Sequence, residues 1–285
     1  MAGCQRYRRR QHGGSVMIAL PALQLGYQFI PKVGTTSLFT FFYTCVHGVD
    51  YDPLRHGRNG RAMFVHRYFI GGDCPDARDV DNRAAAIADY DGYYRFALTR
   101  DPIRRFLSMY VNRVIQKREL AANSPYAQAI MHAGLPFDPD INLLVRHLEA
   151  YLDCHSSLLH HARPMMDFLG PDLSVYDRIA DLSAMNTVVE EIRAHWCRVG
   201  MAARAATAAL PGKMQRCGVR LGLECLTPRS FERLLDYYHA DYAELPTVSL
   251  PEIKAAYTKV AMGAAQIPPS SAARQAVPAA VTIGR

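Results

Sequence analysis

The stretch Phe29-Ile-Pro-Lys-Val-Gly-Thr-Thr-Ser-Leu38 decides how the chain begins to fold. Before it, the run from Leu23 to Ile30 alternates like a strand, which predicts a strand at about 24–30. After the turn, apolar residues predict a helix at about 35–47. The turn places a lysine and hydroxyl side chains at the start of that helix, where main-chain N–H groups favour anions. We interpret it as an anion site; the alternative is a plain turn followed by Thr and Ser caps.

A second strand–turn–helix segment lies further along, at Phe96-Ala-Leu-Thr-Arg-Asp-Pro-Ile-Arg-Arg-Phe-Leu-Ser-Met-Tyr110. Arg100 stands at the end of the predicted strand, and Ser108 lies two turns into the helix. A guanidinium fork and a hydroxyl together can hold a phosphate monoester. The alternative is that Asp101 pairs with a neighbouring arginine on the surface while Ser108 only faces water.

Strands and helices alternate along the first half of the chain, which predicts an α/β protein. We expect a P-loop-like three-layer α/β/α fold with a central mostly parallel sheet and a helical C-terminal part. The further expected elements are strands at 62–66, 93–99 and 174–179, helices at 79–89, 102–120, 183–197 and 228–240, and loop or weak helix at 199–225. Residues 16–265 are expected to form a single domain between a basic disordered tail at 1–15 and a disordered tail at 266–285.

The composition allows a sizeable core, since 49% of the 285 residues are hydrophobic, and the net charge is +7. The positive charge is concentrated before Glu119, in the part that holds both candidate anion sites. A basic balance also suits nucleic acid or a membrane surface. No zinc-finger spacing, RNP-like motif or basic heptad helix occurs, so nucleic acid is not an expected partner. Peripheral membrane association stays open.

The seven cysteines are odd in number and contain no C-x-x-C pair, which argues against a disulfide framework or a zinc site. Reduced thiols favour a cytoplasmic location. An export signal is the alternative, because Arg8-Arg9-Arg10 precedes the apolar run from Val16 to Leu20. That run breaks at Pro21, and no run reaches the roughly 18–20 apolar residues of a membrane span. We expect a basic tail followed by the first strands.

Together, Pro-Lys-x-Gly-Thr-Thr-Ser after a first strand and the later Arg-Asp-Pro-x-x-Arg-x-x-Ser-x-Tyr resemble the sulfotransferases that use 3′-phosphoadenosine 5′-phosphosulfate (PAPS). The order differs from a P-loop ATPase, in which lysine follows the glycine run. The resemblance implies that Arg100 and Ser108 bind the 3′-phosphate. It implies that the 5′-phosphosulfate is bound by Lys32, Val33, Gly34, Thr35, Thr36 and Ser37.

The later chain is similar to the bacterial and carbohydrate branch, sulfotransferase family 2. His161-Ala-Arg-Pro164-Met165 and Val175-Tyr176-Asp177 resemble its His-x-x-Pro-Gln … Tyr-Asp segment, and Tyr237 to Tyr242 resembles its closing helix. Val33, where Thr or Asn is commoner, and Met165, in place of Gln, depart from the pattern. The branch implies a hydroxyl of a carbohydrate or glycolipid as acceptor. Tyr176 is expected either to stack on adenine or to be a core tyrosine.

Sulfuryl transfer depends on positioning and on charge stabilisation, and Lys32 is the natural cation for the bridging oxygen of the leaving phosphate. This scheme requires no metal. The acceptor hydroxyl needs a general base, and His66 is the first choice because it would end a strand where ligands gather. A structural role is the alternative for His66, and His47, His56 and His161 are competing bases.

Two alternatives remain. A metal site at His155, His160 and His161 lacks matching Cys or carboxylate spacing. The chain is alternatively a non-catalytic nucleotide-binding module or a P-loop kinase-like phosphotransferase that uses ATP. Preference for adenosine 3′,5′-bisphosphate over AMP or ATP separates the sulfotransferase from both.

Overall fold

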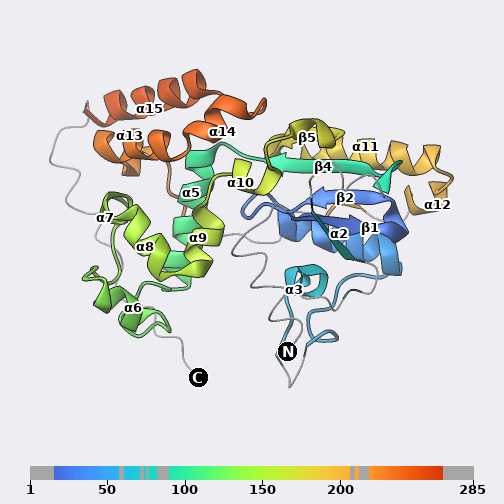
Figure 1. Ribbon diagram of the computed structural model, residues 1–285, viewed down its shortest axis with the longest axis horizontal. Coiled ribbons are helices and arrows are strands. Elements are labelled where there is room, and N and C mark those ends of the chain that lie inside the picture. Colours follow the sequence, from blue (N-terminus) through green and yellow to red (C-terminus); the bar gives the residue numbers. More distant parts are fainter. Residues whose placement is uncertain are drawn as a thin grey trace.

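The computed structural model describes residues 16–57, 61–70, 74, 77–81, 90–205, 209–211 and 218–265. The predicted tails lie outside the described residues, as does residue range 82–89 of the predicted helix at 79–89. Figure 1 shows a sheet with its covering helices on one side and a group of helices on the other. Within the described residues, no helix is both long and apolar enough to cross a membrane.

The sheet has five described strands in the order β3-β1-β2-β4-β5. They are β1 (Val16–Leu20), β2 (Leu25–Gln28), β3 (Arg78–Asp81), β4 (Tyr94–Thr99) and β5 (Arg178–Asp181). Strands β2, β4 and β5 are parallel, whereas β1 is antiparallel to both β2 and β3. The chain is thus an α/β protein, but its sheet is mixed and not mostly parallel as predicted.

A tight hairpin between β1 and β2 accounts for the mixed sheet. The 3₁₀-helix η1 (Pro21–Leu23) and Gln24, at a φ of 49°, turn the chain back directly after β1. Leu20 and Leu25 then face each other across the pair. Because so short a connection can join only antiparallel strands, β1 runs against the parallel part of the sheet.

Helices α2 (Thr35–His47) and α11 (Met185–Arg198) contact each other beside the sheet. The rings of Phe41 and Trp196 stack at 6.0 Å, and the Trp196 indole N–H donates to the Leu23 carbonyl at 2.7 Å. The bounds of α2 are those predicted, and α11 nearly matches its prediction. The short helix α12 (Ala202–Ala205) follows α11 within the stretch predicted as loop or weak helix.

Two expectations about the middle segment are wrong. The stretch predicted as a strand at 62–66 instead leads into helix α3 (Val65–Ile70). Val65, Tyr68 and Phe69 are buried, a spacing that fits one face of a helix, while Phe64 is 70% exposed. Residues 79–81, expected to open a helix, instead belong to strand β3, because they pair with β1 at the sheet edge.

The remaining helices surround a second buried cluster, separate from the one beneath the sheet. The long helix predicted from 102 to 120 is α-helical as α5 (Pro102–Tyr110) and π-helical as η3 (Val111–Gln116). Helix α5 starts at the sheet and runs into the helical group (Figure 1). The other members of the group are α6 (Ala127–His132), α7 (Ile141–Arg146), α8 (Leu148–Cys154), α9 (Ser156–Ala162), α13 (Pro228–Tyr237), α14 (His239–Glu244) and α15 (Leu250–Ala265).

Short segments connect the two clusters. Helix α10 (Met166–Leu169) and the 3₁₀-helix η4 (Leu173–Val175) come before β5, where the sequence predicted a strand from 174. The 3₁₀-helices η5 (Leu182–Ala184) and η6 (Leu223–Cys225) precede α11 and α13. The single domain predicted for 16–265 stays a prediction.

Candidate anion-binding and catalytic site

The two predicted anion segments leave neighbouring strands at the same edge of the sheet. Strands β2 and β4 are parallel, with Gln28 opposite Ala97, so the loop after Gln28 and the turn at Arg100 start close together. Strand β5 is parallel to β4, with Thr99 opposite Asp181, and its following turn reaches the same edge. The carboxyl ends of parallel strands are where open α/β sheets bind ligands.

The first loop has a left-handed main chain at two positions, with φ 71° at Lys32 and 83° at Gly34. Gly34 is the N-cap of α2 and packs against the turn that follows β5. A Cβ atom at Gly34 would lie 2.3 Å from the Met185 Cε atom and 2.8 Å from the Leu182 Cδ1 atom. Glycine is therefore required here both by backbone conformation and by close packing.

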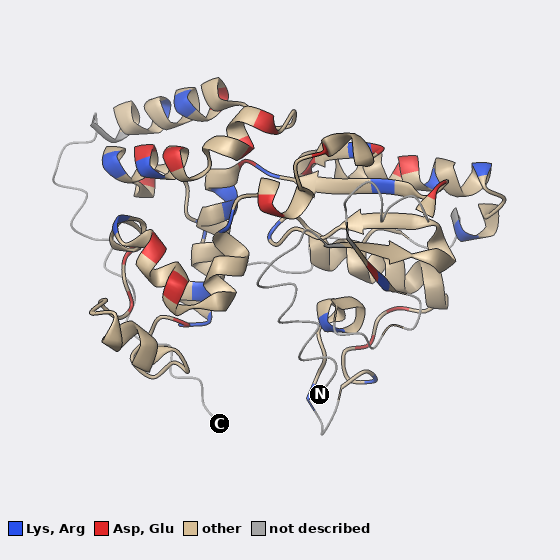
Figure 2. Cartoon of the chain, in the orientation of Figure 1, with Lys and Arg blue, Asp and Glu red and all other residues tan. Residues whose placement is uncertain are grey.

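The start of α2 presents main-chain donors and no negative charge. The N–H groups of Ser37 and Leu38 reach the Gly34 carbonyl at 3.0 and 3.3 Å, whereas those of Thr35 and Thr36 have no carbonyl within the helix to bond. The first turn holds no acidic residue, and Figure 2 shows no charged residue along α2. No side chain in the first turn therefore offsets the positive end of the helix dipole, which favours an anion there.

The side chains of this loop divide into two groups. Val33 is fully buried, and the Thr35 hydroxyl donates to the Ile30 carbonyl at 2.9 Å and lies 3.1 Å from the Tyr27 hydroxyl. Only the main chain of these two residues can face a ligand. The side chains of Lys32, Thr36 and Ser37 are partly exposed at the start of the helix.

The second segment is built around Asp101, the N-cap of α5. Its Oδ1 atom accepts from the Arg104 N–H at 2.8 Å, and its Oδ2 atom accepts from the Tyr242 hydroxyl at 2.8 Å. Arg100 and Ser108 are half-buried, and no hydrogen bond or ion pair joins either side chain to another described residue. Burial, and then Arg104, lower the pKa of Arg100. A half-buried guanidinium with no bonded counter-ion in the described chain suits an anionic ligand.

Arg105 is fully buried. The sequence had suggested for it only a surface pair with Asp101. Its guanidinium donates to the main-chain oxygens of His161 at 3.1 Å and Ala162 at 3.4 Å, and also to that of Arg163. Its carbon Cζ lies 5.8 Å from the ring centre of Tyr238. Arg105 therefore caps the carboxyl end of α9, a role that cations favour at that end of a helix.

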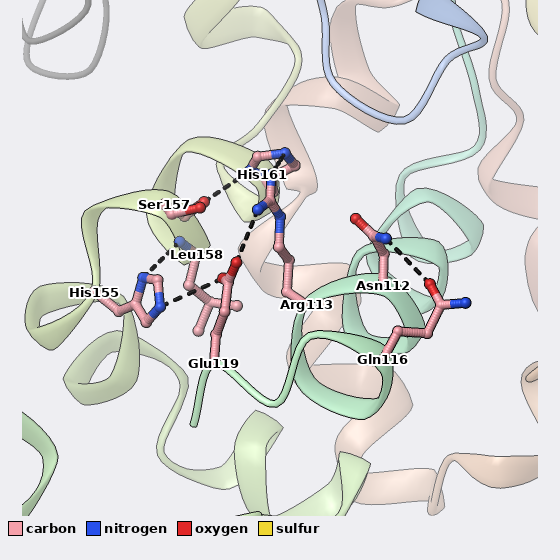
Figure 3. Close-up of polar contacts among 8 residues, drawn as sticks. All are labelled: Asn112, Arg113, Gln116, Glu119, His155, Ser157, Leu158 and His161. Carbon is pink, nitrogen blue, oxygen red and sulfur yellow. Dashed lines mark hydrogen bonds and ion pairs between the residues drawn. The ribbon is translucent and has the colours of Figure 1, made fainter. Parts of the chain in front are cut away.

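Figure 3 shows a buried network around Arg113 in the π-helical segment. Its guanidinium donates to Glu119 Oε1 at 2.8 Å and to His161 Nε2. The His161 Nδ1 atom lies 2.7 Å from the Ser157 carbonyl, so Nδ1 carries the hydrogen and Nε2 accepts. Burial, and then Arg113, hold the pKa of His161 well below its usual value. Both ring nitrogens are occupied, which weakens His161 as a candidate base.

The other predicted histidine cluster members have structural contacts. His155 Nδ1 accepts from the Leu158 N–H at 3.1 Å, its Nε2 lies 3.4 Å from Glu119 Oε2, and its ring stacks on Tyr126 (Figure 3 shows the first two contacts). The His160 ring lies 5.9 Å from that of Phe29. Among the residues that the structure describes, no group of three or more His, Cys, Asp or Glu is arranged to hold a metal ion.

His66 lies beside the first loop, although it sits on α3 and not at a strand end. Its Nε2 atom is 3.3 Å from the Thr36 Oγ1 atom. Burial, then Lys32, Arg113 and Lys117, lower the pKa of His66 to about 4. The structure thus places the predicted base and the predicted cation Lys32 in one electrostatic environment.

The competing bases His47 and His56 belong to an aromatic cluster instead. His47 Nε2 is 2.9 Å from the Tyr68 hydroxyl, and His56 Nε2 is 2.7 Å from the Tyr43 hydroxyl. The rings of Tyr43 and Tyr68 meet edge to face at 5.3 Å. These contacts give both histidines a structural explanation.

Tyr176, which the sequence predicts either to stack on adenine or to lie in the core, is buried in the core. Its side chain is 7% exposed, and its hydroxyl donates to Gln28 Oε1 at 3.1 Å and to the Leu169 carbonyl at 3.0 Å. So little exposed ring leaves little surface for an adenine. A core role is favoured.

Asp241 is a buried residue whose position had no assigned role from sequence. Its carboxylate accepts from the N–H groups of Met165 and Met166, each at 2.9 Å. Burial raises the pKa of Asp241, and the two N–H donors oppose that rise. The signal that could have found it is its place in the Tyr-x-x-Asp-Tyr pattern of the closing helix.

A family model described as the Sulfotransferase family matches residues 17–244. The chain therefore belongs to the sulfotransferase family, in the branch predicted from its motifs, sulfotransferase family 2. No curated protein and no solved structure matched the chain.

Proposed function

We propose that this chain transfers a sulfuryl group from PAPS to a hydroxyl of a carbohydrate or glycolipid. The parallel pairing of β2 with β4 carries the proposal, because it starts two anion-favouring segments side by side. One segment offers the open N-terminus of α2, and the other offers the unbonded guanidinium of Arg100. A donor with phosphate groups at both the 3′ and 5′ positions can present one anionic group to each segment.

The residues have distinct roles in this proposal. Lys32, Gly34, Thr36 and Ser37 bind the 5′ side of the donor, with main-chain help from Val33 and Thr35. Arg100 and Ser108 bind the 3′-phosphate. Tyr176 takes no part in donor binding, because its side chain is only 7% exposed.

The chemistry needs charge stabilisation and a base. When bound, PAPS supplies a sulfuryl group whose departing phosphate oxygen gains negative charge. Lys32 stabilises that charge, and preorganised cations in a dry site commonly contribute several kcal/mol. His66 takes the proton of the acceptor hydroxyl. The scheme needs no metal ion.

Two further parts of the proposal have separate support. The acceptor class rests on the resemblance to the carbohydrate branch, and a sulfate-transfer screen over glycans, lipid glycosides and small phenols tests it. A cytoplasmic location is supported by the five described cysteines, which are free thiols. We also keep the P-loop-like three-layer arrangement as a proposal, supported by the resemblance of the two motifs to those of the sulfotransferases that use PAPS.

Thermal unfolding with different nucleotides tests the donor. Adenosine 3′,5′-bisphosphate should raise the melting temperature well above the effect of AMP or ATP at equal concentration, since a ligand at 100 times its Kd adds about 2.7 kcal/mol. Arg100→Ala should remove the preference for the bisphosphate, whereas Arg146→Ala, at an exposed position on α7, should keep it. Equal stabilisation by AMP and the bisphosphate would overturn the proposal.

A further inference from the structure

The contact between His66 and Thr36 joins the candidate base to the candidate phosphate loop. The His66 Nε2 atom lies 3.3 Å from the Thr36 Oγ1 atom. Within the described chain, Thr36 is the only hydrogen-bond partner of the His66 ring. Phe39 and Phe29 pack edge-on against that ring, at 5.6 and 6.4 Å between centres. The aromatic neighbours hold the ring in place, so that its hydrogen bonding depends on Thr36.

A threonine hydroxyl has one hydrogen to donate. With no anion at the start of α2, the Thr36 hydroxyl can donate to His66 Nε2, which places the imidazole hydrogen on Nδ1. An oxyanion at the helix start offers only acceptors and draws the Thr36 hydrogen to itself. The contact with His66 then survives only if Nε2 carries the hydrogen and Thr36 Oγ1 accepts it.

We propose that Thr36 is a positioning residue that sets the tautomer of His66, so that a bound donor anion moves the imidazole hydrogen to Nε2 and leaves Nδ1 as the basic nitrogen. This inference deepens the proposed function and rests on it. During transfer, Nδ1 accepts the proton of the acceptor hydroxyl while the acceptor oxygen forms its bond to sulfur. The electron pair of the broken S–O bond remains on the bridging phosphate oxygen, beside Lys32.

The charges around His66 explain why its tautomer changes and its net charge does not. The charges of Lys32 in the loop, of Arg113 in the π-helical segment and of Lys117 after it all disfavour a protonated His66. Burial and then these cations lower the pKa of His66 to about 4, so the ring is neutral at pH 7. A bound anion offsets the same cations and raises the basicity of the nitrogen that it frees. Base strength thus becomes linked to the presence of the donor.

The neighbouring hydroxyl of Thr35 cannot serve in the same way. It is engaged with the Ile30 carbonyl and the Tyr27 hydroxyl inside the core. The linkage is therefore specific to Thr36, and two substitutions separate its hydroxyl from its shape. Thr36→Val keeps the branched shape and removes the hydroxyl, whereas Thr36→Ser keeps the hydroxyl.

The test is nuclear magnetic resonance of the full chain with ¹⁵N-labelled histidine, with His66→Gln used to assign the His66 signal. Saturation with adenosine 3′,5′-bisphosphate should move the imidazole hydrogen from Nδ1 to Nε2 in the parent and in Thr36→Ser. Thr36→Val should bind the nucleotide and show no such change. In turnover, Thr36→Val should lose kcat by up to roughly 10²-fold, the lower end of what a positioned base contributes, and Thr36→Ser should recover most of it.

Binding is read separately, by thermal shift on the same samples. If the nucleotide binds but the His66 tautomer stays the same, the inference is wrong while the proposed function stands. The same conclusion follows if Thr36→Val shows the parent's tautomer change. If the bisphosphate stabilises the protein no better than AMP does, the proposed function itself fails, and the inference fails with it.

Discussion

The Arg105 guanidinium donates to the main-chain oxygen of His161 across 3.1 Å, joining the helix of the second anion segment to the end of α9. Asp101, four residues earlier, caps the start of the same helix. Helix α5 is thus held at its first turn by its own cap and, one turn on, by a buried cation. Ser108 therefore lies on a helix with little freedom to shift, and Arg100 lies directly before its N-cap.

Replacing Arg105 should destabilise the fold. Arg105→Met keeps much of the side-chain volume but leaves the buried His161 carbonyl without its donor, at a cost of about 2–4 kcal/mol. The Ala162 carbonyl keeps the Tyr238 hydroxyl as a donor. The free energy of unfolding in urea measures this loss. Arg104→Met, at the exposed neighbouring position, should change stability by less than about 0.5 kcal/mol. Similar losses in both variants would contradict the assigned role of Arg105.

The close packing at Gly34 makes a second prediction. Gly34→Ala adds a Cβ atom into the space of Met185 and Leu182, on top of a φ of 83°. Gly48→Ala is the matched control, since Gly48 has a φ of 70° and nothing within 4 Å of an added Cβ. The free energy of unfolding should fall by about 1–2 kcal/mol in Gly48→Ala, from the left-handed conformation alone, and by more in Gly34→Ala.

Nucleotide binding gives the Gly34 comparison a second readout. Isothermal titration with adenosine 3′,5′-bisphosphate should give a much weaker affinity for Gly34→Ala and an unchanged one for Gly48→Ala, because only Gly34 shapes the loop before α2. Equal affinities in the two variants would show that the loop tolerates the side chain.

Lys32 should be needed for turnover and not for folding. Lys32→Ala removes the cation proposed to stabilise the leaving phosphate oxygen, and we expect a loss of about 10²–10³ in kcat. The melting temperature should change little, because the lysine side chain is partly exposed. Lys259→Ala, at an exposed position on α15, serves as the control. Retained activity in Lys32→Ala would remove this residue from the mechanism.

Stability should fall as the pH falls below about 6.5. The folded-state pKa of His161 lies well below its usual value, chiefly through burial, so the unfolded chain binds a proton at a pH where the folded chain does not. Between pH 7 and pH 5.5 this residue alone should cost about 1 kcal/mol. Denaturant unfolding at both pH values should show a smaller loss for His161→Gln than for the parent, and the exposed His132→Gln should behave as the parent does.

The local pattern was sufficient to predict α2 and the family. Helix α2 has a left-handed glycine at each end, and the predicted bounds agree with the structure. The family assignment needed only the two motifs with their strands, and the family match confirms it. Such features depend on neighbours within a few residues, which is the range over which sequence patterns are informative.

Longer-range contacts decided the features that were missed. A strand was predicted at 62–66 from that stretch alone. Tyr68 and Phe69, which follow it, are buried together with Val65, and this spacing fits a helix. His66 was selected for ending a strand, and it lies by the loop for another reason, its packing against Phe39 of α2. Arg105 looked like any surface cation because its acceptors are carbonyls more than fifty residues away, which no side-chain pattern records.

The bond from Tyr242 to Asp101 has a consequence for how the protein is made. The chain between them spans α5 to α14, so the second anion segment receives one of its supports only when synthesis has passed Tyr242. A nascent or truncated chain that stops before Tyr242 contains both predicted anion segments but lacks this brace. If the segment binds the proposed donor, chains that stop before Tyr242 should bind it more weakly than chains that include it.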